Sequence, residues 1–212
     1  MRSLTPPGVG TMALITSSEV GEGKTTIAAA FARRVAADGF RVLLIDADLR
    51  HPSLSAAWRE GSFCSLEAVL TGAIKFERAV LRDSRSGVDL LLAEGNSDNP
   101  TKLLASDEFK ALLASKREAY DLVLIDSPPV LRVADAILIS KLSPITLLVV
   151  ESGRLSGKQI AEAIRRFPEE ERGKILTLLT RVRPGNLEWG DYYGGYGPAS
   201  PARRTPLALQ RE

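Results

Sequence analysis

The stretch SSEVGEGKTT, residues 17–26, connects an apolar run to a segment rich in helix-forming residues. It follows the phosphate-loop pattern G-x-x-x-x-G-K-[ST], except that Ser18 stands in the place of the first glycine. Gly21 and Gly23 allow consecutive backbone N–H groups to face a phosphate group, and the helix that begins near Lys24 adds the positive end of its dipole. The stretch therefore predicts a strand, a phosphate-binding turn and a helix, in that order.

The rest of the chain alternates between apolar runs and helical patterns. Most of the apolar runs are hydrophobic at nearly every position, which is typical of strands covered on both faces. Six runs are predicted as strands: 12–16, 41–46, 88–93, 121–126, 145–151 and 174–180. Three segments are predicted as helices: 24–39, 106–120, with Ser106 as the N-cap, and 156–167. The alternation predicts an α/β fold, a mostly parallel β-sheet flanked by helices, of the P-loop nucleoside triphosphatase type.

Composition narrows the class of protein. The 212 residues suit one domain with a sizeable core, and the net charge of +2 is too small to indicate nucleic acid binding. The single cysteine, Cys64, cannot form an internal disulfide, which indicates a reducing cytoplasm. No apolar run reaches the roughly 20 residues of a membrane-spanning helix, and the start MRSLTPPGVG has no apolar signal-peptide core. We therefore expect a cytoplasmic protein that does not itself insert into a membrane.

The periodic pattern stops near Pro184, so we expect a P-loop domain over residues 1–183 and a flexible tail over 184–212. The tail contains GDYYGGYG, residues 190–197, which holds three of the four tyrosines of the chain: Tyr192, Tyr193 and Tyr196. The neighbouring glycines leave the rings little apolar surface to pack against. The cluster is either a local tyrosine bias in a disordered end or a set of phenol groups that another group must reach.

Two of the predicted strands end in aspartate. LLIDADLRHP places Asp46 at the end of one strand, Asp48 just beyond it and Arg50 next, and LVLIDSPPV places Asp126 at the end of another. Because the carboxyl ends of parallel strands share one edge of a sheet, we expect these carboxylates beside the phosphate loop. A lone aspartate in such a place commonly caps a helix. Three of them beside a phosphate loop predict a site for a magnesium-bound nucleotide.

Within such a site, Lys24 would reach the β- and γ-phosphates of ATP, and the Thr25 hydroxyl would ligate Mg²⁺. Arg50 could pair with a phosphate or with Asp48, or remain a solvated surface arginine. The residues expected at the nucleotide are Glu19, Val20, Gly21, Glu22, Gly23, Lys24, Thr25, Thr26 and Arg50.

These residues resemble one family. SSEVGEGKTT, VLLIDADLRHP and VLIDSPPV look like the Walker A, Walker A′ and Walker B motifs of the bacterial tyrosine kinases of capsule and exopolysaccharide synthesis, the BY-kinases. The segments SLEAVLTG, LLAEGNSDNPTKLLASDEFKALL and ADAILIS are similar to parts of that family as well. A carboxyl-terminal tyrosine cluster is its other mark, and YYGGYG supplies one. The resemblance covers residues 11–196.

The resemblance implies an ATP-dependent protein-tyrosine kinase that phosphorylates its own tail and regulates the synthesis and export of a capsular or extracellular polysaccharide. Lys24, Asp46 and Asp48 would be catalytic, and Thr25, Asp46 and Asp126 would hold Mg²⁺. The three tail tyrosines would accept the γ-phosphate. A tyrosine hydroxyl has a pKa of about 10, so a nearby carboxylate, Asp46 or Asp48, would accept its proton.

The resemblance also implies partners. The kinase would dock at the inner face of the cell membrane through a membrane polysaccharide co-polymerase or adaptor, and it would act on other copies of itself and on other protein tyrosines. No nucleic acid partner is expected.

The chain departs from the family at several positions. Val20 stands where proline is frequent, Thr180 replaces an asparagine that helps to read adenine, and Lys102 replaces an acidic residue in NPTKLL. The family usually has a helix with E-x-x-R-x-x-R before the phosphate loop, used to pack subunits into a ring, and that motif does not occur in this sequence. We therefore expect a truncated form, a divergent member or a kinase that assembles differently.

Two other functions fit parts of the sequence. Partitioning and division-site ATPases share the sheet and the phosphate loop, but they usually carry a signature lysine where this chain has Glu19. A nucleotide-binding scaffold of a polysaccharide export complex, without kinase activity, would accommodate the missing ring motif and Thr180. The presence of Lys24, Thr25 and the three strand-end aspartates favours the kinase over both alternatives.

Overall fold

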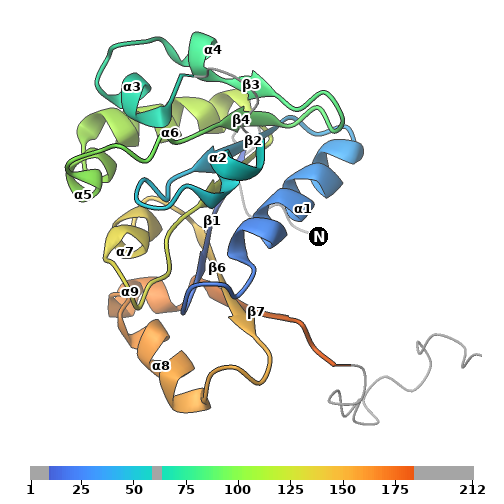
Figure 1. The fold of residues 1–212 in the computed structure, drawn as a ribbon, viewed down its shortest axis with the longest axis vertical. Coiled ribbons are helices and arrows are strands. Elements are labelled where there is room, and N and C mark those ends of the chain that lie inside the picture. The colour runs from blue at the N-terminus through green and yellow to red at the C-terminus, as the bar shows by residue number, and fades with distance from the viewer. Residues whose placement is uncertain (1–9, 59–63, 184–212) are drawn as a thin grey trace, which may run out of the picture. The chain divides into compact units, whose positions relative to one another are not determined.

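The computed structural model describes residues 10–58 and 64–183. Its strands are β1 (Thr11–Ser17), β2 (Val42–Asp46), β3 (Leu81–Arg82), β4 (Asp89–Leu91), β5 (Leu122–Asp126), β6 (Ile145–Glu151) and β7 (Ile175–Thr180). They form one seven-stranded sheet in the order β3-β4-β2-β5-β1-β6-β7 (Figure 1). Every neighbouring pair is parallel except β3 and β4, which are antiparallel. The prediction of a mostly parallel sheet is confirmed.

The three predicted helices are present as α1 (Lys24–Ala37), α6 (Asp107–Ala119) and α8 (Gly157–Arg165). Ser106 caps α6 as expected, because its side-chain oxygen accepts the backbone N–H of Phe109 at 3.2 Å. Six shorter helices were not predicted: α2 (Ser53–Trp58), α3 (Leu66–Leu70), α4 (Phe76–Ala79), α5 (Pro100–Leu104), α7 (Asp135–Ser140) and α9 (Glu169–Arg172). Each has too few residues for a helical period to be recognised in the sequence.

Helices cover both faces of the sheet. On one face, Ala28 and Ala32 of α1 pack with Ile15 of β1, and on the other, Phe109 of α6 packs with Leu14 of the same strand. Figure 1 shows α1 along the first face, whereas α6, α7 and α8 contribute to the core of the second. Successive residues of β1 therefore point into two separate apolar layers, which explains why the central strands are hydrophobic at every position.

Two strands differ from the prediction. The run 88–93 forms a strand only over Asp89–Leu91, with β3 added beside it at the edge of the sheet. At the opposite edge, Leu176 and Leu179 of β7 are 57% and 55% exposed, so this strand is not covered on both faces. Within the described residues, no helix is both long and apolar enough to cross a membrane.

The register of the central strands places the predicted site. Asp46, the last residue of β2, pairs directly with Asp126, the last residue of β5, and Asp126 in turn lies opposite Ile15 of β1. The loop between β1 and α1 begins just beyond that point. Both strand-end carboxylates therefore lie at the same edge of the sheet as the loop.

Candidate active site

The loop between β1 and α1 has the backbone that a phosphate-binding turn needs. Gly21 and Gly23 have φ angles of 85° and 93°, in the left-handed region that glycine adopts without steric cost. Gly23 is also the N-cap of α1, and no acidic side chain occupies the first turn of that helix. The free N–H groups at the start of α1 therefore remain available to an anion.

Lys24 lies between two aspartates at the end of this loop. Its Nζ atom is 3.3 Å from Oδ2 of Asp48 and 3.5 Å from Oδ1 of Asp126, and it lies 3.2 Å from the Thr25 hydroxyl oxygen. Only 10% of the lysine side chain is exposed. The ammonium group is thus held at the point where the motif expects phosphate oxygens, with carboxylates as its partners.

Asp126 also binds the helix that follows the loop. The Thr25 hydroxyl donates a hydrogen bond of 2.7 Å to Oδ2 of Asp126. Burial raises the pKa of the Asp126 carboxyl, and the charge of Lys24 and the hydrogen bond from Thr25 act in the opposite direction. A fully buried carboxylate therefore depends on these two residues for its charge.

Asp46 is enclosed rather than open to solvent. Its Oδ2 atom accepts hydrogen bonds from the backbone N–H and the hydroxyl of Ser55, at 2.9 and 2.7 Å, and Oδ1 accepts the backbone N–H of Asp48 at 3.2 Å. Burial raises the pKa of Asp46 to about 7, with a further contribution from the charge of Asp126, and the hydrogen bonds from Ser55 partly offset the rise. Ser55 was not predicted, because serine in a short helix carries no motif.

A cavity of about 590 Å³ adjoins these groups. Among the predicted site residues, its wall contains Val20, Gly21, Gly23, Lys24, Thr25, Thr26, Asp48 and Arg50. Four other predicted residues, Glu19, Glu22, Asp46 and Asp126, do not line the cavity, and the last three are fully buried. The other lining residues are His51, Ser53, Pro128, Pro129, Arg132, Val133 and Arg181. The predicted tyrosines of the tail lie outside the described residues.

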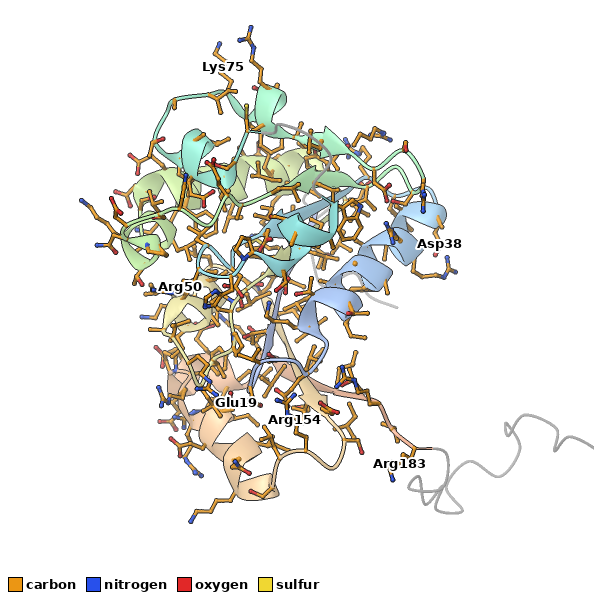
Figure 2. All side chains as sticks on the ribbon, viewed as in Figure 1. Glu19, Asp38, Arg50, Lys75, Arg154 and Arg183 are labelled. Carbon is orange, nitrogen blue, oxygen red and sulfur yellow. The ribbon has the colours of Figure 1, made fainter. Side chains whose placement is uncertain are left out.

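Arg50 has a partner that the sequence did not indicate. Its Nε atom is 3.0 Å from Oδ2 of Asp135, at the start of α7, and its terminal nitrogen donates to the Thr101 hydroxyl at 2.9 Å. Figure 2 shows Arg50 on the segment after β2, directed toward α7. In this structure the ion-pair partner of Arg50 is therefore Asp135, rather than Asp48 or solvent.

Two residues of the phosphate loop, Glu19 and Glu22, are bound by residues that are distant in the sequence. The Glu19 carboxylate, which is labelled in Figure 2, pairs with Arg132 at 2.7 Å. Thr180 donates its hydroxyl to the backbone carbonyl of Glu22 at 2.8 Å. Thr180 is therefore attached to the loop, although it lies at the end of the outermost strand.

The donor set suits a magnesium-bound nucleotide. In the ranges 10–58 and 64–183, no group of three or more His, Cys, Asp or Glu side chains is arranged to hold a metal ion by itself. Mg²⁺ usually binds through one or two carboxylates plus substrate phosphates, so Thr25, Asp46 and Asp126 fit a site that a nucleotide completes. The Ser18 hydroxyl, buried and without a hydrogen-bond partner among the described residues, leaves one further polar group for a ligand or water.

Comparison with known proteins agrees with this geometry. Residues 11–176 match the family described as the AAA domain. The chain is 39% identical over 184 residues to the tyrosine-protein kinase YwqD of Bacillus subtilis. This match covers 87% of this chain and 76% of YwqD. It is 32% identical over 166 residues to the tyrosine-protein kinase ptk of Acinetobacter johnsonii. That match covers 77% of this chain but only 23% of ptk.

The solved kinase domain of VpsO has a similar fold, with a TM-score of 0.76 at 30% identity over 82% of this chain and 86% of that domain. The sheet, the phosphate loop and the likeness to YwqD over most of both chains lead to one conclusion: this chain belongs to the bacterial tyrosine-protein kinases.

Proposed function

We propose that the cavity beside the phosphate loop binds Mg-ATP and that the kinase transfers the γ-phosphate to tyrosines of its own tail, Tyr192, Tyr193 and Tyr196. The observation that carries the proposal is the position of Lys24, whose ammonium group lies within 3.5 Å of both Asp48 and Asp126 at the cavity wall. Phosphoryl transfer needs positioning and charge neutralisation more than covalent chemistry, and this arrangement supplies both.

The residues that line the cavity and the carboxylates buried next to it would have different roles. The backbone N–H groups of the loop would bind the β-phosphate, and Lys24 would exchange its carboxylate partners for β- and γ-phosphate oxygens. Thr25, Asp46 and Asp126 would hold Mg²⁺, which would neutralise charge on the same phosphates. The buried carboxylates would then be compensated by the metal.

We assign proton acceptance to Asp48. Of the two candidate bases, Asp48 lines the cavity, whereas both oxygens of Asp46 accept hydrogen bonds from Ser55 or Asp48 behind its wall. When Lys24 binds phosphate, the Asp48 carboxylate loses its ion-pair partner and becomes available to a phenol. The tyrosine oxygen bonds to the γ-phosphorus, the bond from that phosphorus to ADP breaks, and the phenol proton passes to Asp48.

Phosphorylation of the tail would act as a release signal. Each phosphate adds about −1.5 to −2 charges at neutral pH. A tail with two or three phosphates would be repelled by the acidic residues of the same edge of the sheet, Asp46, Asp48 and Asp126. We propose that this change moves the kinase between a docked and a released population.

We also propose the biological setting. By similarity to the BY-kinases, the chain would regulate export of a capsular or extracellular polysaccharide and would work at the inner face of the cell membrane, bound to a co-polymerase or adaptor. Its other partners would be copies of itself and exogenous protein tyrosines.

The test is incubation of the purified full chain with Mg-ATP, followed by mass spectrometry and measurement of ADP release. Phosphate on the tail tyrosines, with an initial rate per enzyme that rises with protein concentration, is expected for transfer between copies. ADP release without phosphotyrosine would instead indicate a switch ATPase. Nucleotide binding without either activity would indicate a scaffold.

A further inference from the structure

Glu22 is a fully buried glutamate inside the proposed phosphate-binding loop. Glutamate is rarely buried completely unless it is paired. A negative charge so close to a triphosphate also opposes the electrostatics that the rest of the loop provides. Its exposed fraction is nevertheless 0%. The contacts of its side chain explain the burial.

Both carboxylate oxygens of Glu22 accept backbone hydrogen bonds. Oε2 accepts the N–H of Glu19 at 2.7 Å, at the start of the same loop, and Oε1 accepts the N–H of Glu151 at 3.2 Å, at the end of β6. The backbone carbonyl of Glu22 accepts the hydroxyl of Thr180, the last residue of β7, at 2.8 Å. Residue 22 is therefore fixed to its own loop and to the ends of two strands that lie side by side in the sheet (Figure 1).

The side chain is directed away from the nucleotide cavity. Gly21 and Gly23, the sequence neighbours of Glu22, line the cavity, whereas Glu22 does not. The negative charge is thus directed toward two N–H donors, and the neighbouring backbone is left to face the phosphates. Because both glycines have positive φ angles and many alternative conformations, three hydrogen bonds at the residue between them restrict the loop strongly.

We propose that Glu22 is a positioning residue: its carboxylate, together with the Thr180 hydroxyl, holds the phosphate loop in the shape that binds nucleotide before the nucleotide arrives. This inference rests on the proposed nucleotide site. It also assigns the Thr180 hydroxyl a role in loop geometry. We assign Glu22 neither the role of a base nor that of a metal ligand, because its carboxylate binds the backbone N–H groups of Glu19 and Glu151.

Glutamine is the sharpest substitution, because it keeps the size but has one acceptor oxygen, and its amide group would face an N–H donor. The variants are Glu22→Gln, Thr180→Val, which removes the hydroxyl, and Thr180→Ser, which restores it. Glu162→Gln makes the same chemical change on the exposed surface of α8, where Glu162 pairs with Arg165 at 3.0 Å. Calorimetry with ADP, steady-state autophosphorylation and thermal unfolding are measured on each full chain.

We expect Glu22→Gln and Thr180→Val to weaken ADP binding about tenfold and to raise the KM for ATP by a similar factor, since each loses one hydrogen bond that orders the loop. The value of kcat at saturating ATP should stay within about twofold of the wild type, because the catalytic groups are untouched. Thr180→Ser and Glu162→Gln should bind ADP like the wild type.

Unchanged ADP affinity with a lower unfolding temperature would reduce Glu22 to a structural residue and overturn the inference. A loss of kcat at unchanged affinity would overturn it as well, by placing Glu22 in the chemical step. If Glu22→Gln fails to fold, the Thr180→Val and Thr180→Ser pair decides alone. A wild-type chain that binds no nucleotide would refute the proposed function and this inference together, whereas normal wild-type binding with unaffected variants would refute this inference only.

Discussion

The Nζ atom of Lys24 lies 3.3 Å from Oδ2 of Asp48, and both side chains are almost completely buried. The lysine of the phosphate loop therefore neutralises the aspartate that we assign as the base. A bound phosphate would compete for the same ammonium group. In the mechanism that we propose, nucleotide binding would therefore also activate Asp48, because a phosphate that binds Lys24 would leave Oδ2 of Asp48 without its ion-pair partner.

The first prediction concerns Lys24→Met. Loss of a charge-assisted bond to phosphate should weaken ADP binding by roughly 10- to 100-fold and abolish phosphotyrosine formation. The free protein should also unfold at a lower temperature, because Asp48 and Asp126 lose their buried counter-charge. Calorimetry and thermal unfolding measure the two effects. Lys158→Met, an exposed change on α8, is the control, and unchanged ADP affinity in Lys24→Met would remove this cavity as the nucleotide site.

The second prediction separates the two aspartates of the A′ motif. Asp48→Asn should lower kcat by about 100-fold or more and leave the Mg²⁺ concentration needed for half-maximal rate close to the wild-type value, because the amide cannot accept a proton. Asp46→Asn should raise that Mg²⁺ requirement, because a carboxylate near Asp126 is lost. Titration of initial rates with Mg²⁺ distinguishes them. Full activity in both variants would leave the A′ carboxylates without a role.

The third prediction is a pH dependence of stability. The pKa of Asp46 is raised from 3.8 to about 7, so the folded protein holds this proton more tightly than the unfolded chain does. The contribution of Asp46 to stability is therefore fully present at low pH and is lost as the pH rises toward 7. The side chain of the Asp46→Asn variant cannot titrate, so its free energy of unfolding should improve relative to the wild type on going from about pH 5 to about pH 8.

Urea unfolding at the two pH values, without nucleotide or metal, measures this difference. Since the Asp46→Asn substitution also changes a hydrogen bond to the backbone of Asp48, the absolute stability of the variant is not informative. The change with pH is the relevant quantity. A difference between variant and wild type that stays constant across the range would contradict the prediction.

The fourth prediction concerns which tyrosines are phosphorylated. Tyr120 donates its hydroxyl to Oδ2 of Asp89 at 3.0 Å, and burial and that carboxylate raise its pKa. It also precedes β5, whereas Asp126 ends that strand beside the phosphate loop, so its hydroxyl belongs to the opposite edge of the sheet. After incubation with Mg-ATP, mass spectrometry should find phosphate on the tail tyrosines and little on Tyr120.

Two variants complete that test. Tyr120→Phe should leave the amount of phosphotyrosine unchanged. Deletion of the residues after Arg183 should abolish autophosphorylation but spare ADP binding, because the cavity is lined by residues up to Arg181. Strong phosphorylation of the shortened chain would show that the main acceptors lie elsewhere.

The central strands could be predicted from the sequence because burial on two faces makes a parallel strand hydrophobic at every position. The two residues of β3 could not, since Leu81 and Arg82 pair with β4 only after the chain has reversed its direction. β7 is as rich in leucine and isoleucine as the buried central strands, although two of its leucines are exposed. Position at the edge of a sheet is a property of the fold and leaves no mark on the strand itself.

The same contrast applies to the site. The residues of the phosphate loop are contiguous, so a motif finds them, and the aspartates follow from the rule that parallel strands end at one edge. The partners that hold these groups are distant in sequence: Asp135 is 85 positions from Arg50, and Thr180 is 158 positions from Glu22. Such pairs depend on which loops the fold brings together, and neither residue type nor spacing indicates them.

The direct pairing of Asp46 with Asp126 has a consequence for how this enzyme can be altered. Side chains along a strand alternate between faces, so inserting or deleting one residue within β2 or β5 would turn a carboxylate toward the opposite helical layer. The turn from β3 to β4 lies at the other edge of the sheet, where the parallel strands begin, and no residue of the site depends on its length. We therefore expect the site to tolerate inserted segments in the turn from β3 to β4 better than insertions within β2 or β5.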